Sequence, residues 1–249
     1  MMVTGEAIEN ALIDELNDMG LPHMAATLDA IYHSEEFLQI DRITLLASMI
    51  EAEYSDKISK RVNNRLRHAR LIGGPEELSN CVDSTSREYL PNGITENLAS
   101  MNFVRTGRNI CILGKSDSGK TYLARAVGME ACKNFKVEYH HCDDFLEKLA
   151  VLKRDDFNKY QKRFHLLAKL DVLILDDFLL HTLVNEEEVK VLFNVLETRS
   201  ENQKSTIVCS QRDPVSWTSM MLNDEISANA ILKRVTKHYT IVINSKSAG

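Results

Sequence analysis

The sequence predicts an α/β fold in which a parallel sheet of five strands follows a small all-α N-terminal segment. After residue 105, short apolar runs rich in β-branched residues alternate with helical stretches, which is typical of a parallel sheet with helices on both faces. The first 70 residues show only helical periodicity. The expected strands are 110–113, 137–141, 172–175, 206–209 and 239–243.

The N-terminal part is predicted to be helical throughout. Apolar residues recur at near-helical spacing from residue 6 to 19, and Gly20-Leu21-Pro22 then ends the first helix. A second helix follows, and Asp41 caps a third that continues through a basic stretch. Gly73-Gly74-Pro75 ends this region. We therefore expect three parts, with boundaries at 1–74, 75–104 and 105–249.

The expected strands alternate with four helices. The run 172–175 is continuously apolar, as is expected of a parallel strand that is buried on both faces. Residues 75–104 contain the turn signal Pro91-Asn92-Gly93 and are expected to form short helices. The helices of the last part are expected at 121–134, 143–169, 186–202 and 224–236.

The composition is that of a globular cytoplasmic protein without a membrane span. The chain is 44% hydrophobic and 27% charged, and no apolar run approaches the roughly 18 residues of a spanning helix. The number of cysteines is odd and none has CxxC spacing, which argues against a zinc or disulfide framework. The net charge of −6 excludes a general polycationic attraction to nucleic acid, but it leaves room for a local basic patch.

Residues 114–121 match the phosphate-binding pattern GxxxxGK[ST], and they lie between a predicted strand and a predicted helix. Backbone N–H groups of such a loop surround phosphates, and the helix N-terminus adds a positive end. Lys120 is expected to reach the β- and γ-phosphates of ATP, and the Thr121 hydroxyl to ligate Mg²⁺. The expected ATP-binding residues are Gly114, Lys115, Ser116, Asp117, Ser118, Gly119, Lys120 and Thr121.

Two acids, Asp176 and Asp177, directly follow the apolar run 172–175. At a strand end beside a phosphate loop, one carboxylate can serve the Mg²⁺ ion and the next can polarise the attacking water. We assign Asp176 to the metal and Asp177 to water activation, which predicts ATP hydrolysis. Because Asp177 is shorter than a glutamate, we expect slow turnover without DNA or a partner. The alternative is that both acids only cap a helix or face solvent.

Two further polar residues are candidates for catalysis. Gln211 follows the strand 206–209, and ligands of a parallel nucleotide-binding sheet lie at the carboxyl ends of its strands. Arg234 lies on the helix before the last strand, where it can act on a neighbouring subunit's nucleotide as an arginine finger. The alternatives are a simple strand exit for Gln211 and a solvated surface arginine for Arg234.

A basic stretch from residue 57 to 70 lies on the third predicted helix. Its apolar residues recur at helical spacing, so that one face packs and the others are cationic. Few aromatic residues accompany the cations, so we expect contact with the backbone of duplex DNA rather than base stacking. The alternative is a solvated face that pairs with the acidic N-terminal segment. The candidate DNA-binding residues are Lys57, Lys60, Arg61, Arg65, Arg67 and Arg70.

Several segments together resemble the IstB-like family of transposition helper ATPases, an AAA+ group near the DnaC-like helicase loaders. Residues 21–25 resemble the family's LPxMA segment, and 51–54 its EAEW segment. Residues 119–124 resemble GKTHLA, 175–178 LDD(F/W), and 205–211 STIVTSQ. The resemblance covers nearly the whole chain. It implies an AAA+ core without a C-terminal lid, and an N-terminal domain for oligomerisation and DNA contact.

The resemblance also implies partners: duplex DNA, a transposase and further copies of the same chain. Two departures from the family pattern are the acid Asp117 inside the phosphate loop and Lys233 where the family has an aspartate. Two other functions stay open from the sequence. One is a DnaC-like helicase loader, which uses the same nucleotide machinery. The other is a nucleotide-gated DNA-binding scaffold with little turnover, which the acid in the loop would favour.

Overall fold

The computed structural model describes residues 5–222 and 224–245, and these form two compact units that meet between Asn64 and Arg65 in the sequence. The first unit contains α1 (Gly5–Asp18), α2 (Pro22–Tyr32) and most of α3 (Arg42–Ala69). Glu53 on α3 accepts a hydrogen bond from the first backbone N–H of α2, that of His23, at 3.0 Å. This bond satisfies one of the N–H groups that a helix start leaves without an intrahelical partner.

The second unit is built on one six-stranded sheet in the order β1-β6-β2-β5-β4-β3. Five strands are parallel and are those predicted from the sequence, whereas β1 pairs with β6 in the antiparallel direction. The bounds are β1 Arg87–Leu90, β2 Ile110–Gly114, β3 Val137–His141, β4 Val172–Asp176, β5 Ser205–Ser210 and β6 Tyr239–Ser245.

The prediction of five strands was therefore short by one. The strand β1 lies in the expected connector 75–104, has only four residues, and is followed directly by Pro91. Only Tyr89 within it is buried, because β1 is at the edge of the sheet. An edge strand of this length carries neither the apolar run of a buried parallel strand nor a long alternation.

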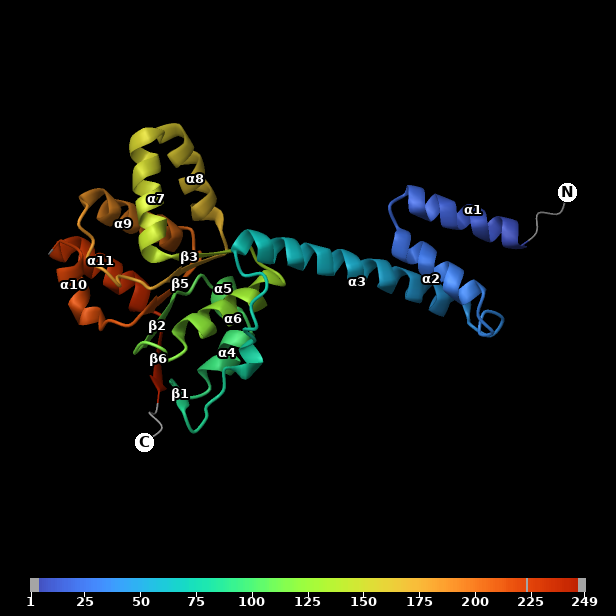
Figure 1. Ribbon diagram of the computed structural model, residues 1–249, viewed down its shortest axis with the longest axis horizontal. Helices are drawn as coiled ribbons and strands as arrows, with labels where there is room; N and C mark the ends of the chain where they lie inside the picture. Colours follow the sequence, from blue (N-terminus) through green and yellow to red (C-terminus); the bar gives the residue numbers. More distant parts are fainter. Residues whose placement is uncertain (1–4, 223, 246–249) are drawn as a thin grey trace. The chain divides into compact units, whose positions relative to one another are not determined.

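Helices cover both faces of this sheet (Figure 1). On one face, α4 (Ile94–Ala99), α5 (Asn102–Arg105) and α6 (Lys120–Cys132) pack on strand residues such as Ile112 and Ile174. The neighbouring residues of the same strands, such as Cys111 and Leu173, face the other side. The helices on that side are α7 (Cys142–Asp155), α8 (Phe157–Lys169), α9 (Glu186–Glu201), α10 (Trp217–Met220) and α11 (Glu225–Thr236).

One expected helix is interrupted. The sequence predicts a single helix over 143–169, but α7 ends at Asp155 and α8 begins at Phe157. Asp156 between them has a non-helical backbone, and its carboxylate accepts a hydrogen bond from the N–H of Lys159 at 2.9 Å. It therefore caps α8, as aspartate commonly does at a helix start. None of the helices in the described residues is long and apolar enough to cross a membrane.

Candidate functional site

The carboxyl ends of β2, β4 and β5 meet at a cavity of about 330 Å³. The loop after β2 and the start of α6 form one wall, and the residues that follow β4 and β5 form the other. A parallel sheet of this kind binds ligands at such carboxyl ends. The cavity is lined by Ser116, Asp117, Gly119, Lys120, Thr121, Asp177 and Gln211.

Two glycines of the loop are required by its geometry. A Cβ atom on Gly114 would lie 2.5 Å from Ser118 Oγ and 2.8 Å from the carbonyl oxygen of Ile243, which leaves no room for any side chain. Gly119 has a φ of +98°, in the left-handed region that glycine adopts without strain. Asp117 is also left-handed, with a φ of 59°. These turns fold the loop back over the start of α6.

Lys120 is the first residue of α6 and is only 8% exposed. Its Nζ donates a hydrogen bond to the carbonyl oxygen of Lys115 at 2.7 Å, so the ammonium group lies inside the loop. Ser118 is fully buried, and its hydroxyl oxygen has no hydrogen-bond partner among the described residues. The loop therefore holds a buried ammonium group that lines the cavity and that an anionic ligand would satisfy, whereas Ser118 does not line the cavity.

Asp176 is the last residue of β4 and is 1% exposed. The Tyr139 hydroxyl donates to its Oδ2 at 2.6 Å, and the N–H of Asp177 donates to its Oδ1 at 3.0 Å. Burial, together with the Asp176 charge, raises the pKa of Tyr139 far above its usual value, so this hydroxyl remains a donor. Two carboxylate oxygens offer about four acceptor positions, so Asp176 keeps capacity for a further ligand.

Asp177, unlike Asp176, lines the cavity directly. Its φ is 52°, a left-handed conformation that aspartate tolerates better than most residues. The turn is held because Phe178 N–H donates to the carbonyl oxygen of Cys209 at 2.7 Å. Asp177 Oδ2 lies 3.3 Å from Nδ1 of His141, the last residue of β3. The sequence offered no reason to select His141, because its contact with Asp177 depends on the order of the strands.

Arg87 is a second residue that the sequence does not single out. It begins β1, and the antiparallel direction of that strand brings it to the same edge of the sheet as the phosphate loop. A Cβ atom added to Gly119 would lie 2.8 Å from Cζ of Arg87, so the guanidinium group is in contact with the loop backbone. Arg87 Nε is buried and has no hydrogen-bond partner among the described residues.

The two other catalytic candidates are placed differently. Gln211 follows β5 and lines the cavity beside Asp177. Arg234 is on α11, where it pairs with Glu197, donates to its own helix at Ala230 and lies 5.2 Å over the Phe193 ring. It is absent from the lining of the cavity in its own chain.

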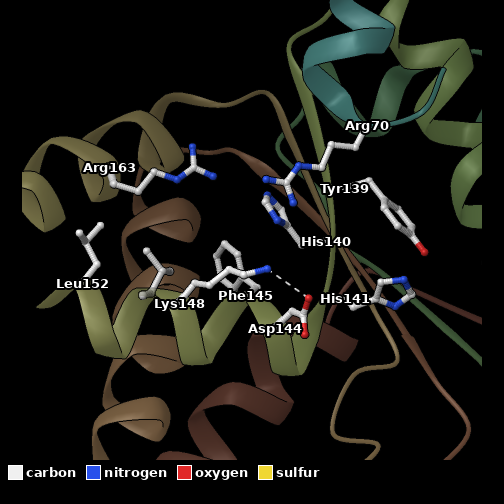
Figure 2. A pocket seen from close by; sticks show the side chains of 10 residues that line it. Arg70, Tyr139, His140, His141, Asp144, Phe145, Lys148, Leu152 and Arg163 are labelled. Atoms are coloured by element: carbon white, nitrogen blue, oxygen red, sulfur yellow. Dashed lines mark hydrogen bonds and ion pairs between the residues drawn. The ribbon is translucent and has the colours of Figure 1, made fainter.

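A second cavity, of about 400 Å³, lies beside β3 and α7 (Figure 2). Arg70 and Arg163 reach toward each other from opposite sides above the His140 ring. Burial by itself would raise the pKa of Glu138, which neighbours this cavity. The bonds from His140 and Arg163 outweigh that effect and lower the pKa to about 2. Arg163 is therefore committed to Glu138, to which it donates at 2.9 Å.

The cations of the basic stretch differ in whether they have partners in their own chain. Lys57 and Lys60 lie in the first unit and pair with Glu53 and Asp56, four residues earlier on α3. Arg65 lies in the second unit and donates to the carbonyl oxygens of Cys132 and Lys133 at the end of α6. No ion pair or side-chain hydrogen bond involves the other three cations within residues 5–222 and 224–245. These are Arg61, Arg67 and Arg70.

Comparison with known proteins agrees with this geometry. A model of the family described as IstB-like ATP binding protein matches residues 14–248. The chain belongs to the IstB-like ATP-binding protein family. A putative insertion sequence ATP-binding protein of Sinorhizobium fredii is 31% identical over 226 residues, covering 90% of this chain and 89% of its own. The insertion sequence IS21 putative ATP-binding protein of Pseudomonas aeruginosa is 25% identical, covering 90% and 83%.

Solved structures similar to this IstB-like chain support the fold. The crystal structure of DnaI matches with a TM-score of 0.54 and 21% identity, covering 68% of this chain and 92% of that one. The replication initiator DnaA bound to AMPPCP and single-stranded DNA matches with a TM-score of 0.56 and 21% identity, covering 70% of this chain and 52% of that one. The predicted P-loop AAA+ fold and the resemblance to IstB-like proteins are thus confirmed.

Proposed function

We propose that this IstB-like chain hydrolyses ATP with Mg²⁺, assembles with further copies on duplex DNA, and recruits or stimulates a transposase. The observation that carries the proposal is the single cavity at which the phosphate loop, Asp177 and Gln211 converge. The names of relatives, insertion sequence ATP-binding proteins, support the ATP and the transposition context. DNA contact is supported by Arg61, Arg67 and Arg70, which are not paired with acids in the described residues.

The cavity residues divide the hydrolysis between them. Lys120 leaves the Lys115 carbonyl and donates to the β- and γ-phosphates, with the loop N–H groups around them. Asp177 orients a water molecule and accepts its proton while the water oxygen bonds to the γ-phosphorus. The bond from that phosphorus to the β–γ bridging oxygen breaks, which leaves ADP and inorganic phosphate. Gln211 donates its amide hydrogens to the water or to a γ-phosphate oxygen.

The residues present fit a magnesium ion. Mg²⁺ takes oxygen ligands and keeps several waters. Thr121 lines the cavity and carries a hydroxyl, and Asp176 carries a buried carboxylate at the end of β4. Tyr139 and the Asp177 N–H fix the orientation of that carboxylate. When bound, the ion supplies positive charge that offsets the charge of the triphosphate.

Assembly supplies the group that one chain lacks. In the single chain, the Arg234 guanidinium group is already paired with Glu197 and lies over the Phe193 ring. We propose that contact with a neighbouring copy releases it toward that copy's γ-phosphate, as an arginine finger. Turnover would then rise with protein concentration and with DNA, on which copies collect. Arg234→Ala should remove this rise and leave ATP affinity nearly unchanged.

The deciding experiment measures phosphate release and particle size on duplex DNA, with ATP, ADP or no nucleotide. We expect DNA to stimulate release, and Asp177→Asn to lower kcat by about 100-fold or more while ATP still binds. If the particles formed on DNA had the same size with ATP, with ADP and without nucleotide, the proposal that ATP controls assembly would be contradicted. Binding of ATP and DNA without phosphate release in any condition would favour a nucleotide-gated DNA-binding scaffold with little turnover. Capture of a replicative helicase instead of the transposase would favour a DnaC-like helicase loader.

A further inference from the structure

The helical hairpin of α1 and α2 contains three side chains that converge on one point. They are Glu9 on α1 and Asp29 and His33 on α2, and one ligand atom from each lies within 4.8 Å of the others. His33 Nε2 is 3.4 Å from Glu9 Oε1 and 3.4 Å from Asp29 Oδ1. All three belong to the same compact unit.

Glu9 is the unusual member of this group. It is 3% exposed, and neither of its carboxylate oxygens accepts a hydrogen bond from any described residue. A buried carboxylate without hydrogen bonds is costly unless a cation balances it. The nearby Asp29 increases the cost, because a second negative charge faces the same point. The imidazole between them contributes at most one proton.

The distances match those of a metal centre. In a tetrahedral zinc site with nitrogen and oxygen ligands about 2.0–2.2 Å from the ion, neighbouring ligand atoms are about 3.3–3.5 Å apart. The two distances measured from His33 Nε2 fall in that range. Two carboxylates and one imidazole form a donor set that suits zinc. Three protein ligands leave a fourth position for water or for a ligand from another molecule.

We propose that Glu9, Asp29 and His33 bind one zinc ion that joins α1 to α2. The ion would balance the buried Glu9 carboxylate, whose oxygens accept no hydrogen bond from a described residue, and would offset the charge of Asp29. Zinc would thereby raise the thermal stability of the hairpin in a concentration-dependent manner, since it binds the folded arrangement only. This site shares no residue with the nucleotide cavity, so the zinc proposal does not depend on the proposed ATPase activity.

The test titrates the purified full chain with zinc chloride, without nucleotide, by calorimetry, and with Co²⁺ by visible absorption. We expect one ion to bind with a dissociation constant of about 10 μM or lower, and His33→Asn and Asp29→Asn each to weaken binding at least tenfold. His33 is 61% and Asp29 56% exposed, so neither change should unfold the hairpin, which circular dichroism would verify.

His23→Asn is the matched control, because His23 lies in the same unit and faces a single carboxylate, Asp56, at 3.3 Å. This variant should bind zinc as the wild type does. Equal zinc affinity in the wild type and in His33→Asn would overturn the proposal, since the ion would then bind elsewhere. Absence of binding by the wild type would also overturn it.

A different observation carries a second inference, which rests on the proposed nucleotide site. We infer that Arg87 binds a phosphate of the nucleotide. Its guanidinium group contacts the phosphate loop at Gly119, and its Nε has no hydrogen-bond partner in the part of the chain that the structure describes. A guanidinium group matches phosphate oxygens with two parallel N–H donors. Position, charge and unused donor all favour an anionic ligand held between Arg87 and the loop.

Binding of a non-hydrolysable ATP analogue to Arg87→Gln tests this role. We expect affinity to fall at least tenfold, with partial recovery in Arg87→Lys, and no change in Arg108→Gln, whose arginine donates instead to the Tyr239 hydroxyl. The unfolding temperature without nucleotide should be similar in all of them. Unchanged affinity in Arg87→Gln would overturn this inference alone. No binding by the wild type would overturn the proposed nucleotide site, and the inference with it.

Discussion

The phosphate loop and the basic stretch are both short runs that the sequence marks by residue type, but the structure uses their cations differently. In the loop, Lys120 lies in the cavity where the motif requires it. In the basic stretch, Lys57, Lys60 and Arg65 already have partners in their own chain. The phosphate-loop motif specifies a backbone conformation, so it also predicts where its lysine lies. A run of charged residues does not specify its neighbours, and those neighbours decide which of its cations are available for a ligand.

The largest expected effect distinguishes two lysines of the loop itself. Lys120→Ala should lower kcat/KM for ATP by about 100-fold or more, because it removes the buried ammonium group that faces the phosphates. Lys115→Ala should have little effect, because Lys115 is seen to contribute its backbone carbonyl. Phosphate release and nucleotide binding would measure both. A comparable loss in the two variants would show that charge, rather than position in the motif, determines the function of the loop.

Arg163 is a cation outside both segments, and it forms an ion pair with Glu138. Against the opposing effect of burial, His140 and Arg163 lower the pKa of Glu138 from its ordinary 4.5 to about 2, so its contribution to stability is present above pH 4.5 and is lost as the pH falls toward 2. The shift corresponds to about 3 kcal/mol of unfolding free energy. Urea unfolding at pH 7, 5 and 3 should show this loss in the wild type. The loss should be much smaller in Glu138→Gln, and an identical pH dependence would contradict the assignment.

Arg65 belongs to the basic stretch by sequence, but in the structure it is half-buried and bonded to the end of α6. Its guanidinium group donates to the carbonyls of Cys132 and Lys133, where α6 ends and carbonyls lack intrahelical partners. Arg65→Gln should therefore lower the unfolding free energy by about 1–2 kcal/mol, measured from the urea midpoint. Arg67→Gln should leave the midpoint unchanged within about 0.5 kcal/mol. If both variants lost the same stability, the Arg65 contacts would not be the cause.

The parts of the fold that the sequence predicted are those whose signals are local. The parallel strands are short runs rich in β-forming residues, most of them apolar, and Gly114 and Gly119 stand where the loop turns tightly. The sixth strand was not predicted, because Arg87–Leu90 becomes a strand only through pairing with β6. The contact of His141 with Asp177 was missed for the same reason, since strand order brings these residues together.

The smallest expected effect concerns DNA affinity and its dependence on salt. Arg67→Gln should weaken duplex binding a few-fold and reduce the slope of log affinity against log salt by about 0.9, the value for one lost phosphate contact. The matched control is the double variant Asp56→Asn with Lys60→Gln, which removes an ion pair and leaves the net charge unchanged. It should bind like the wild type. If the salt slope fell equally in the double variant and in Arg67→Gln, ion pairing on α3 would not determine which cations contact phosphate. The proposed difference between the paired and the unpaired cations of the basic stretch would then be wrong.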